Sequence, residues 1–274
     1  MIDYNSFRHA LTSVYDTGEA NAIARLVYEK CCSLSLADVY ACKDTQLSAE
    51  TYEVLQKTLE RLLLHEPVQY VLGETDFCGR RFSVNRNVLI PRPETEELCR
   101  LVKAGEGMRI LDACTGSGCI AITLALDIKG SQVCAFDISQ PALDVAQQNA
   151  KALGANVNFY VADALSLDDV NDKFDAIVSN PPYICEREKA GMNANVLDYE
   201  PSGALFVSDE NPIVFYRAIT DFASRNLKSN GKLYFEVNPK FADEIGKYVN
   251  SKGFTTVNIH LDSFGKKRFI EAQL

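Results

Sequence analysis

The stretch Ile110-Leu111-Asp112-Ala113-Cys114-Thr115-Gly116-Ser117-Gly118-Cys119-Ile120-Ala121 decides the fold that we predict for this chain. Its apolar start is typical of a buried β-strand, its two glycines indicate a tight turn, and its apolar end is typical of a helix that begins there. Glycines permit close approach of the backbone to a ligand, and a helix N-terminus attracts an anion. The stretch therefore predicts a strand, a ligand-binding turn and a helix.

From residue 94 onward, apolar runs that resemble strands alternate with helical segments. The runs cover residues 109–113, 132–137, 156–161, 174–179 and 232–237. This alternation predicts a mostly parallel sheet with helices on both faces, and ligands that bind at the carboxyl ends of the strands. Asp137 ends the second run about 20 residues after Gly116, the spacing at which an acidic side chain reaches a ribose diol. Asp163 follows the third run, where we expect it to meet an adenine edge.

The glycine turn alone leaves two classes of cofactor open. Gly116-x-Gly118-x-x-Ala121 also satisfies the dinucleotide pattern of nicotinamide enzymes. Against that class, no histidine that could relay protons follows the later strands, and the fourth strand ends in residues with no obvious role in hydride transfer. An adenosine cofactor with a carboxylate tail instead of a pyrophosphate fits both observations. S-adenosylmethionine is such a cofactor, and its sulfonium methyl group is an electrophile.

Asn180-Pro181-Pro182-Tyr183 follows the fourth apolar run and predicts the second half of the site. A planar amide or exocyclic amine is a poor nucleophile because its nitrogen lone pair is delocalised. The Asn180 side-chain oxygen and the Pro181 carbonyl can each accept one N–H bond and thereby aim the lone pair at an electrophile. Proline brings no competing donor, and we expect Tyr183 to stack on the flat group. An ordinary turn that caps the core is the structural alternative for these residues.

The first part of the chain has a helical, glycine-poor pattern, from which we expect a bundle over residues 1–73. Its clearest stripe is Tyr52, Leu55, Leu59 and Leu62, on a helix that begins after Ser48. Shorter helices are expected at 19–32 and 36–42. Residues 74–93 then change period and predict a β-hairpin that ends in a stiff, proline-rich linker. The sheet-containing domain occupies residues 94–274.

Composition argues against several classes of function. A net charge of −9 over 274 residues does not suit a sequence-independent grip on a phosphate backbone. The nine cysteines include no CxxC pair and the three histidines are scattered, so we expect reduced thiols, no disulfide framework and no metal site. The N-terminus resembles no targeting segment, and no stretch approaches a membrane-spanning length. We expect a cytoplasmic monomer without direct contact to nucleic acid or membrane.

Over most of its length, the chain resembles the protein-glutamine N5-methyltransferases that modify class I peptide-chain release factors. The matching segments are 66–73, 88–96, 115–118, 180–184 and 198–201. The Pro-Arg-Pro-Glu-Thr-Glu run at 91–96 is the most specific, because general amino-methyltransferases that share the Asn-Pro-Pro-Tyr motif lack it. The first 60 or so residues match in helical character alone.

The resemblance implies a Rossmann-like, seven-stranded methyltransferase domain preceded by the helical bundle and the hairpin. It implies that S-adenosylmethionine is held by Cys114, Thr115, Gly116, Ser117, Gly118, Asp137, Asp163, Ala164 and Asn180. The acceptor would be the glutamine of a Gly-Gly-Gln loop, bound by Asn180, Pro181, Pro182 and Tyr183. Of these, Asn180, Pro181 and Tyr183 would take part in catalysis. The helical bundle would help to dock the release factor.

Three alternatives remain at this stage. A sibling enzyme that methylates a glutamine of a ribosomal protein would use the same pocket. An amino-methyltransferase of adenine or guanine would flip a base into it, and would need a basic groove and an added recognition domain. A module that keeps the fold without catalysis would fail to bind the cofactor.

Two residues leave their roles open. Arg92 suits either the cofactor carboxylate or a structural pair with Glu94 or Glu96. Cys114 stands where the family usually has glycine, and we expect its Cβ to be tolerated only if its φ is negative. We expect the Cys114 thiol to serve packing, because methyl transfer to an amide needs no thiol.

Overall fold

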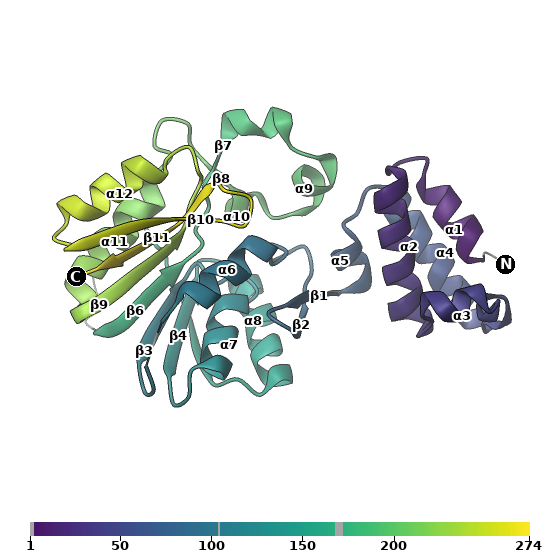
Figure 1. The fold of residues 1–274 in the computed structure, drawn as a ribbon, viewed down its shortest axis with the longest axis horizontal. Coiled ribbons are helices and arrows are strands. Elements are labelled where there is room, and N and C mark those ends of the chain that lie inside the picture. Colours follow the sequence, from purple (N-terminus) through teal and green to yellow (C-terminus); the bar gives the residue numbers. More distant parts are fainter. Residues whose placement is uncertain (1–2, 104, 168–171) are drawn as a thin grey trace. The chain divides into compact units, whose positions relative to one another are not determined.

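The computed structural model describes residues 3–103, 105–167 and 172–274. It divides into two compact units (Figure 1). The first comprises Met1–Glu74 together with Asn193–Tyr199, and the second comprises Thr75–Met192 and Glu200–Leu274. The segment Asn193–Tyr199 thus belongs to the first unit, although the residues on both sides of it belong to the second. In the described ranges, no helix combines the length and the apolar character needed to cross a membrane.

The first unit is helical, as predicted. Its elements are α1 (Tyr4–Leu11), α2 (Thr17–Cys32), α3 (Leu36–Tyr40), the 3₁₀ helix η1 (Lys43–Gln46), α4 (Ala49–Leu63), α5 (Val68–Leu72) and α9 (Ala194–Tyr199). Helix α4 begins where expected, because the Ser48 side chain accepts a hydrogen bond from Thr51 N. Leu55, Leu59 and Leu62 of the predicted stripe are buried in the core of this unit.

The predicted hairpin consists of β1 (Glu74–Phe77) and β2 (Arg80–Ser83). Both residues of its turn, Cys78 and Gly79, have positive φ, at 48° and 71°, as a two-residue hairpin turn requires. Phe77 and Phe82 pack edge to face with ring centroids 5.9 Å apart and are buried. The hairpin is therefore packed into the core of the second unit by its aromatic residues.

The second unit is built on a seven-stranded sheet of order β10-β11-β9-β6-β3-β4-β5. The strands are β3 (Arg109–Ala113), β4 (Gln132–Asp137), β5 (Val157–Val161), β6 (Phe174–Ser179), β9 (Leu227–Glu236), β10 (Thr256–Leu261) and β11 (Lys267–Gln273). The five strands from β9 to β5 are parallel, and β11 is antiparallel to both of its neighbours. The predicted fold class is confirmed. A separate parallel pair joins β7 (Ile184–Cys185) to β8 (Phe206–Val207).

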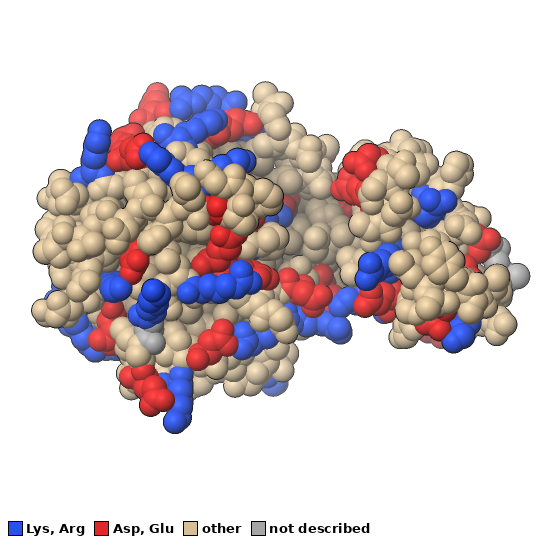
Figure 2. Space-filling view, viewed as in Figure 1, with Lys and Arg blue, Asp and Glu red and all other residues tan. Residues whose placement is uncertain are grey.

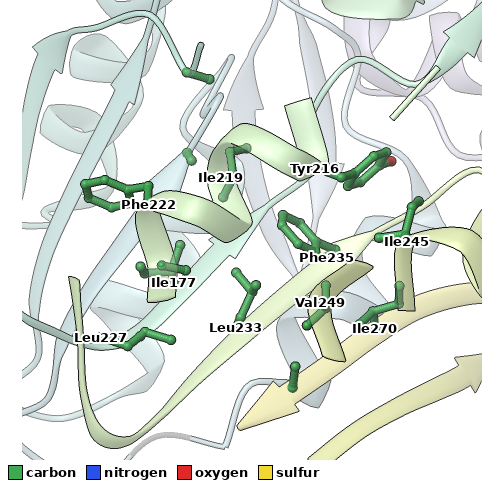
Figure 3. Close-up of a cluster of buried hydrophobic side chains, with 14 of the residues drawn as sticks. Ile177, Tyr216, Ile219, Phe222, Leu227, Leu233, Phe235, Ile245, Val249 and Ile270 are labelled. Atoms are coloured by element: carbon green, nitrogen blue, oxygen red, sulfur yellow. The ribbon is translucent and has the colours of Figure 1, made fainter. Parts of the chain in front are cut away.

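Side chains alternate along the strands and build one core on each face of the sheet. On one face, Ala176, Val178 and Tyr234 pack with α6 (Pro93–Leu101), α7 (Cys119–Asp127) and α8 (Gln140–Leu153). On the other face, strand residues pack with α11 (Val214–Asn226) and α12 (Ala242–Ser251). Figure 3 shows this second core, where Leu233 and Phe235 of β9 lie among side chains of both helices. Each such fully buried side chain contributes about 1.5–3 kcal/mol. The remaining short helices are η2 (Glu186–Gly191) and α10 (Ser202–Leu205).

Candidate active site

The register of the parallel strands brings four chain positions to one edge of the sheet. Ala113 of β3 pairs with Phe136 of β4 and with Ser179 of β6, and Ser179 pairs in turn with Phe235 of β9. The Ser179 hydroxyl donates to the Ala113 carbonyl at 2.7 Å, which fixes β6 against β3. The residues that follow these four are Cys114, Asp137, Asn180 and Glu236. They stand at the carboxyl ends of the strands, where the strand order reverses and such sheets bind ligands.

A cavity of about 450 Å³ opens at this edge, entirely within the second unit. Nine of the predicted site residues line it: Cys114, Thr115, Gly116, Ser117, Asp137, Asp163, Ala164, Asn180 and Pro182. Gly118, Pro181 and Tyr183 do not border it among the described residues. The cavity also has a wall that the strand pattern did not indicate, made of residues 87–89, 91–92, 201 and 203–204. The structure therefore gathers most, but not all, of the predicted residues around one space.

Hydrogen bonds hold the glycine turn after β3 in one shape. The Asp137 carboxylate accepts from Gly116 N at 2.9 Å and from Ser139 N at 3.0 Å. The buried Asp112 carboxylate accepts from the Thr115 hydroxyl at 2.5 Å and from Ala121 N at 3.1 Å. Because each carboxylate oxygen carries two lone pairs, Asp137 can still accept from a bound hydroxyl. The protein's own hydrogen bonds therefore hold the turn in this shape.

The two glycines of the turn have different roles. Gly116 has φ +55°, and a Cβ placed on it would meet no atom within 4 Å, so its surface is open toward the cavity that it lines. Gly118 has φ +80°, and a Cβ there would meet Ile122 Cδ1 at 2.9 Å and Ala146 Cβ at 3.0 Å. Gly118 thus permits α7 and α8 to pack closely. The contacts of Gly118 give no support to the prediction that it lies against the cofactor.

Cys114 corrects one of our expectations. Its φ is +62°, in the left-handed region, whereas we expected a side chain to be tolerated only at negative φ. A short side chain can occupy this region at a cost of about 1–2 kcal/mol. The Cys114 thiol packs against the core between the sheet and helices α11 and α12, and burial raises the pKa of this thiol. It is therefore protonated at neutral pH, in agreement with a packing role.

Arg92 has a partner that the sequence did not suggest. Its guanidinium pairs with Glu200, whose other oxygen accepts from Ile90 N at 3.2 Å, rather than with Glu94 or Glu96. The Glu200 side chain is 1% exposed, and that of Arg92 is 33% exposed. A buried carboxylate without its partner would be costly. The pair therefore fixes the segment around Pro91 beside Pro201, and both prolines line the cavity.

We call Asn180–Tyr183, the residues predicted to hold the substrate amide, the clamp. A chain of hydrogen bonds holds the side chains of Asn180 and Tyr183. Asn180 Nδ2 donates to Thr95 Oγ1 at 3.2 Å, and the Thr95 hydroxyl donates to Glu236 Oε2 at 2.7 Å. Within the described chain, Asn180 Oδ1 makes no hydrogen bond, so its lone pairs are available to a bound group. The Tyr183 hydroxyl donates to Glu236 Oε1 at 3.1 Å, and burial, with Glu236 nearby, raises the pKa of this tyrosine. Stacking of the Tyr183 ring on a substrate stays a prediction.

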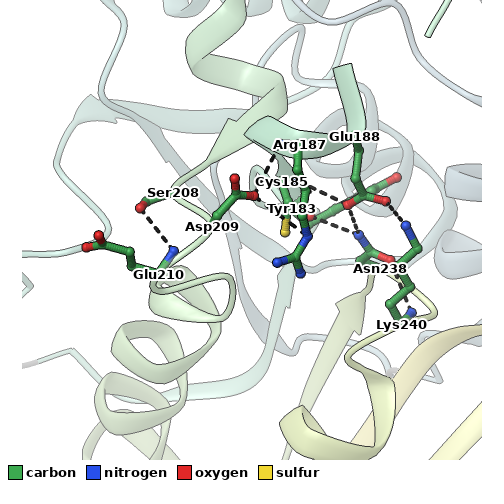
Figure 4. A network of polar contacts seen from close by, with 9 residues as sticks. All are labelled: Tyr183, Cys185, Arg187, Glu188, Ser208, Asp209, Glu210, Asn238 and Lys240. Atoms are coloured by element: carbon green, nitrogen blue, oxygen red, sulfur yellow. Dashed lines mark hydrogen bonds and ion pairs between the residues drawn. The ribbon is translucent and has the colours of Figure 1, made fainter. Parts of the chain in front are cut away.

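A second network holds the backbone after the clamp (Figure 4). Asn238 Nδ2 donates to the Tyr183 carbonyl at 3.1 Å and to Glu188 Oε1 at 2.9 Å. Glu188 also accepts from Cys185 N at 3.1 Å and from Lys240 Nζ at 2.5 Å. Both Glu236 and Asn238 lie at the carboxyl end of β9, so one strand end supports the side chains and the main chain of the clamp.

The sequence did not indicate that Thr95, Glu236 and Asn238 support the clamp. Thr95 lies inside the Pro-Arg-Pro-Glu-Thr-Glu run, but nothing in that run shows which side chain faces the clamp. A usable signal was the carboxylate that ends the apolar run Leu233-Tyr234-Phe235-Glu236, because a charge at the end of a buried strand is costly unless it has partners.

We expect the stability of the ligand-free protein to depend on pH through Asp112. Its burial raises the pKa to about 7 from an ordinary value of 3.8. Because the folded value is the higher one, the stabilising contribution is full below about pH 4 and is lost as pH rises through 7. Asp112→Asn keeps an oxygen for both hydrogen bonds and carries no charge. From pH 5 to pH 8, we expect wild type to lose on the order of 2 kcal/mol more unfolding free energy than Asp112→Asn. Urea denaturation at both pH values measures this, and parallel losses in the two proteins would rule it out.

The residues around the cavity fit S-adenosylmethionine. Ile138 and Leu165 are apolar yet 67% and 47% exposed, and they line the cavity next to Asp137 and Asp163, as a purine ring beside a ribose requires. Helix α7 begins at the cavity without a side-chain cap, which leaves backbone N–H groups for a carboxylate. The open backbone of Gly116 leaves room for the tail between them. The contact of Asp137 with the ribose hydroxyls stays a prediction.

Comparison with known proteins gives matches along nearly the whole chain. A family model described as the PrmC N-terminal domain matches residues 4–73, and one described as a methyltransferase domain matches residues 104–251. The release factor glutamine methyltransferase of Bacteroides thetaiotaomicron is 42% identical over 271 residues, which cover 97% of this chain and 96% of the relative. The release factor glutamine methyltransferase of Flavobacterium psychrophilum is 40% identical over 272 residues, which cover 97% of this chain and 95% of the relative.

Among solved structures, a methyltransferase from Pyrococcus furiosus superimposes with a TM-score of 0.54 at 16% identity. The match covers 78% of this chain and 96% of that one. At this level of identity, the similarity supports the fold of the second unit and says nothing about the acceptor.

Proposed function

We propose that the cavity of this chain, which belongs to the family of release factor glutamine methyltransferases, holds S-adenosylmethionine beside the clamp, and that the clamp binds one glutamine side chain. The enzyme transfers a methyl group from S-adenosylmethionine to a release factor glutamine. The finer assignment is that the methyl group goes to the side-chain nitrogen of the glutamine in the Gly-Gly-Gln loop of class I factors. The observation that carries this proposal is the Asn180 carboxamide, whose nitrogen is bound to Thr95 and whose oxygen is available.

Several residues of the cavity would hold the cofactor. When bound, S-adenosylmethionine supplies a methyl group that its positively charged sulfur makes electrophilic. Asp137 would accept from the ribose hydroxyls and Asp163 from the adenine amino group, with Ala164 beside it. The turn from Cys114 to Ser117 and the N-terminus of α7 would hold the carboxylate tail.

The clamp acts on the lone pair of the substrate nitrogen. Asn180 Oδ1 and the Pro181 carbonyl would each accept one N–H of the glutamine amide, which fixes both hydrogens and turns the lone pair away from the plane of the amide. Pro182 lines the cavity and shapes the entry of the side chain. Tyr183 is held by its hydroxyl bond to Glu236, and its ring would flank the amide. The nitrogen becomes acidic only once it has gained the methyl carbon, so the clamp needs no side chain that removes a proton beforehand.

A labelling experiment tests the acceptor. Purified protein with methyl-labelled cofactor is incubated separately with a release factor, with ribosomal proteins, with ribosomal RNA and with DNA. We expect label on the release factor alone, and fragmentation in a mass spectrometer should place it on the side-chain nitrogen of the Gly-Gly-Gln glutamine. A release factor with asparagine in place of that glutamine is the control and should stay unlabelled. Label confined to ribosomal protein, RNA or DNA would overturn the proposed acceptor.

We propose that the first unit docks the release factor. Leu64 of this unit is 70% exposed although it is apolar, and its carbonyl accepts from the Tyr199 hydroxyl at 2.7 Å. Tyr199 ends the segment Asn193–Tyr199, which also carries the exposed Leu197 and follows the clamp along the chain. A large apolar side chain that is this exposed, next to the segment that follows the clamp, suits a protein-binding surface.

Leu64→Glu is expected to raise the KM for release factor about tenfold, because burying a new carboxylate at an interface is costly. The kcat and the Kd for S-adenosylmethionine should not change. Val54→Glu is the matched control, since Val54 is also apolar and exposed in this unit but lies in the N-terminal half of α4, away from the helix end that carries Leu64. Steady-state kinetics with intact release factor measure both variants. An unchanged KM for Leu64→Glu would remove Leu64 from the docking surface.

We also propose a cytoplasmic monomer that makes no direct contact with nucleic acid. All nine cysteines are free thiols, which suits a reducing compartment. On the face shown in Figure 2, acidic and basic side chains of the second unit are interspersed and form no continuous basic stripe of the kind that binds a phosphate backbone. A dimer mass in light scattering, or binding to RNA at physiological salt, would contradict this proposal.

A further inference from the structure

The clamp works only if the oxygen of the Asn180 carboxamide, and not its NH₂ group, faces the glutamine NH₂. A carboxamide has an oxygen on one side and an NH₂ group of nearly the same size on the other. If the group were turned over, an NH₂ would face the NH₂ of the glutamine, and the hydrogen bond would be lost. Some part of the protein must therefore set its direction.

Thr95 sets the direction at the first step. Its hydroxyl has a single proton, which it donates to Glu236 Oε2 at 2.7 Å. The Thr95 oxygen is then left to accept, and the group at 3.2 Å from it must be the Asn180 NH₂. Thr95 is 3% exposed, so water does not replace either bond.

Glu236 sets the direction for Thr95. An ionised carboxylate only accepts hydrogen bonds, and Glu236 accepts one from Thr95 and one from the Tyr183 hydroxyl, at 2.7 Å and 3.1 Å. It is 1% exposed, which is an expensive place for a carboxylate, and burial raises its pKa accordingly. A glutamine of the same shape would avoid that cost, so stability does not account for a glutamate at this position.

We propose that Glu236 and Thr95 are positioning residues that fix the direction of the hydrogen bonds from Asn180 to Thr95 to Glu236. They keep the Asn180 oxygen toward the substrate, so that the site accepts an NH₂ group and rejects a carbonyl or carboxylate oxygen in the same place. This inference rests on the proposed function of Asn180.

The first test uses isosteric variants. In Glu236→Gln, the side-chain oxygen is needed to accept from the buried Tyr183 hydroxyl, so the new NH₂ faces Thr95 and donates to it. The Thr95 proton then goes to Asn180, and the Asn180 carboxamide turns over. We expect kcat to fall about 10- to 100-fold, while the Kd for S-adenosylmethionine stays the same and Tm is equal or higher. Thr95→Val, which removes the relay, should lose a similar factor in kcat. Thr95→Ser, which keeps the hydroxyl, should retain most of the activity. A residue that only supports the fold would lower kcat and Tm together.

The second test reverses the direction of the chain. Asn180→Asp places two carboxylates beside the single Thr95 proton and should be nearly inactive. Adding Glu236→Gln supplies a side-chain amide that donates to Thr95, and the Thr95 hydroxyl can then donate to the carboxylate introduced at position 180. Every group is thereby satisfied again. We expect the double variant to be at least about tenfold more active than Asn180→Asp, although Glu236→Gln is harmful alone. A double variant no better than Asn180→Asp would overturn the relay.

The outcomes separate this inference from the function beneath it. If wild type fails to methylate the release factor, or Asn180→Ala keeps full activity, the proposed function fails. If wild type is active and Asn180→Ala is not, but Glu236→Gln and Thr95→Val keep wild-type kcat, only the positioning role fails.

Discussion

Replacing Asn180 with alanine is expected to lower kcat for glutamine methylation by about 10²–10³-fold. The variant loses the acceptor that fixes one N–H of the glutamine amide, and the lone pair of the amide nitrogen therefore stays delocalised. The Kd for S-adenosylmethionine should remain within about twofold, because the wall of the cavity next to α7 and β4 is unchanged. Single-turnover methylation of intact release factor gives the rate, and equilibrium dialysis gives the Kd.

The control for this variant is Asn87→Ala. Asn87 also borders the cavity, yet it lies between the hairpin and Pro91 and not at the end of a strand of the central sheet. We expect it to leave kcat largely unchanged. An active Asn180→Ala protein, or equal losses in the two variants, would show that the amide clamp is not the source of catalysis.

The glycines of the turn should give the second large effect, and they should separate stability from cofactor binding. Gly118→Ala is expected to lower the free energy of unfolding by about 3 kcal/mol. The new Cβ would lie 2.9 Å from Ile122 Cδ1 and 3.0 Å from Ala146 Cβ, closer than van der Waals contact allows. Gly154→Ala is the matched control. Gly154 has a similar φ of +72° with nothing within 4 Å, so it should cost only about 1 kcal/mol.

Gly116→Ala should resemble the control in stability and differ in binding. Its Cβ also meets nothing in the protein, but it would occupy space against the cavity, and we expect the Kd for S-adenosylmethionine to rise about tenfold or more. Urea denaturation and calorimetric titration of the three variants provide the comparison. If Gly118→Ala were no less stable than Gly154→Ala, the packing role of Gly118 would be wrong.

The parts of the fold that the sequence predicted are those with strong local patterns. The bounds of β3, β4 and β6 agree with the predicted runs, because these central strands are buried on both faces and are largely apolar. The start of α4 agrees because Ser48 caps it locally. The runs did not include β10 and β11, which carry charged and polar residues such as Lys267 and Glu271. The edge strand β10 has no fully buried residue, and in β11 the buried residues Phe269, Ile270 and Ala272 stand among charged and polar ones, so neither strand has a continuous apolar run.

The candidate site was predicted where it depends on strand ends and missed where it depends on long-range pairing. The expectation that residues after β3, β4 and β6 meet follows from the parallel sheet. The contact of Thr95 with Glu236 spans 141 positions and that of Arg92 with Glu200 spans 108. Such pairs depend on the register of β9 and on the path of the chain around Glu200, which no local spacing encodes. The φ of Cys114 is likewise set by the bonds of the turn around it and not by its own preference.

The central claim is that Asn180 and Pro181 hold the glutamine amide by its two hydrogens. The most direct measurement is a crystal structure of the protein with S-adenosylhomocysteine and a release factor bound through its Gly-Gly-Gln loop. We predict that the glutamine side-chain nitrogen lies about 3 Å from both Asn180 Oδ1 and the Pro181 carbonyl oxygen, with its lone pair toward the sulfur. A glutamine that turns its carbonyl oxygen toward Asn180, or that lies outside the cavity, would contradict the account.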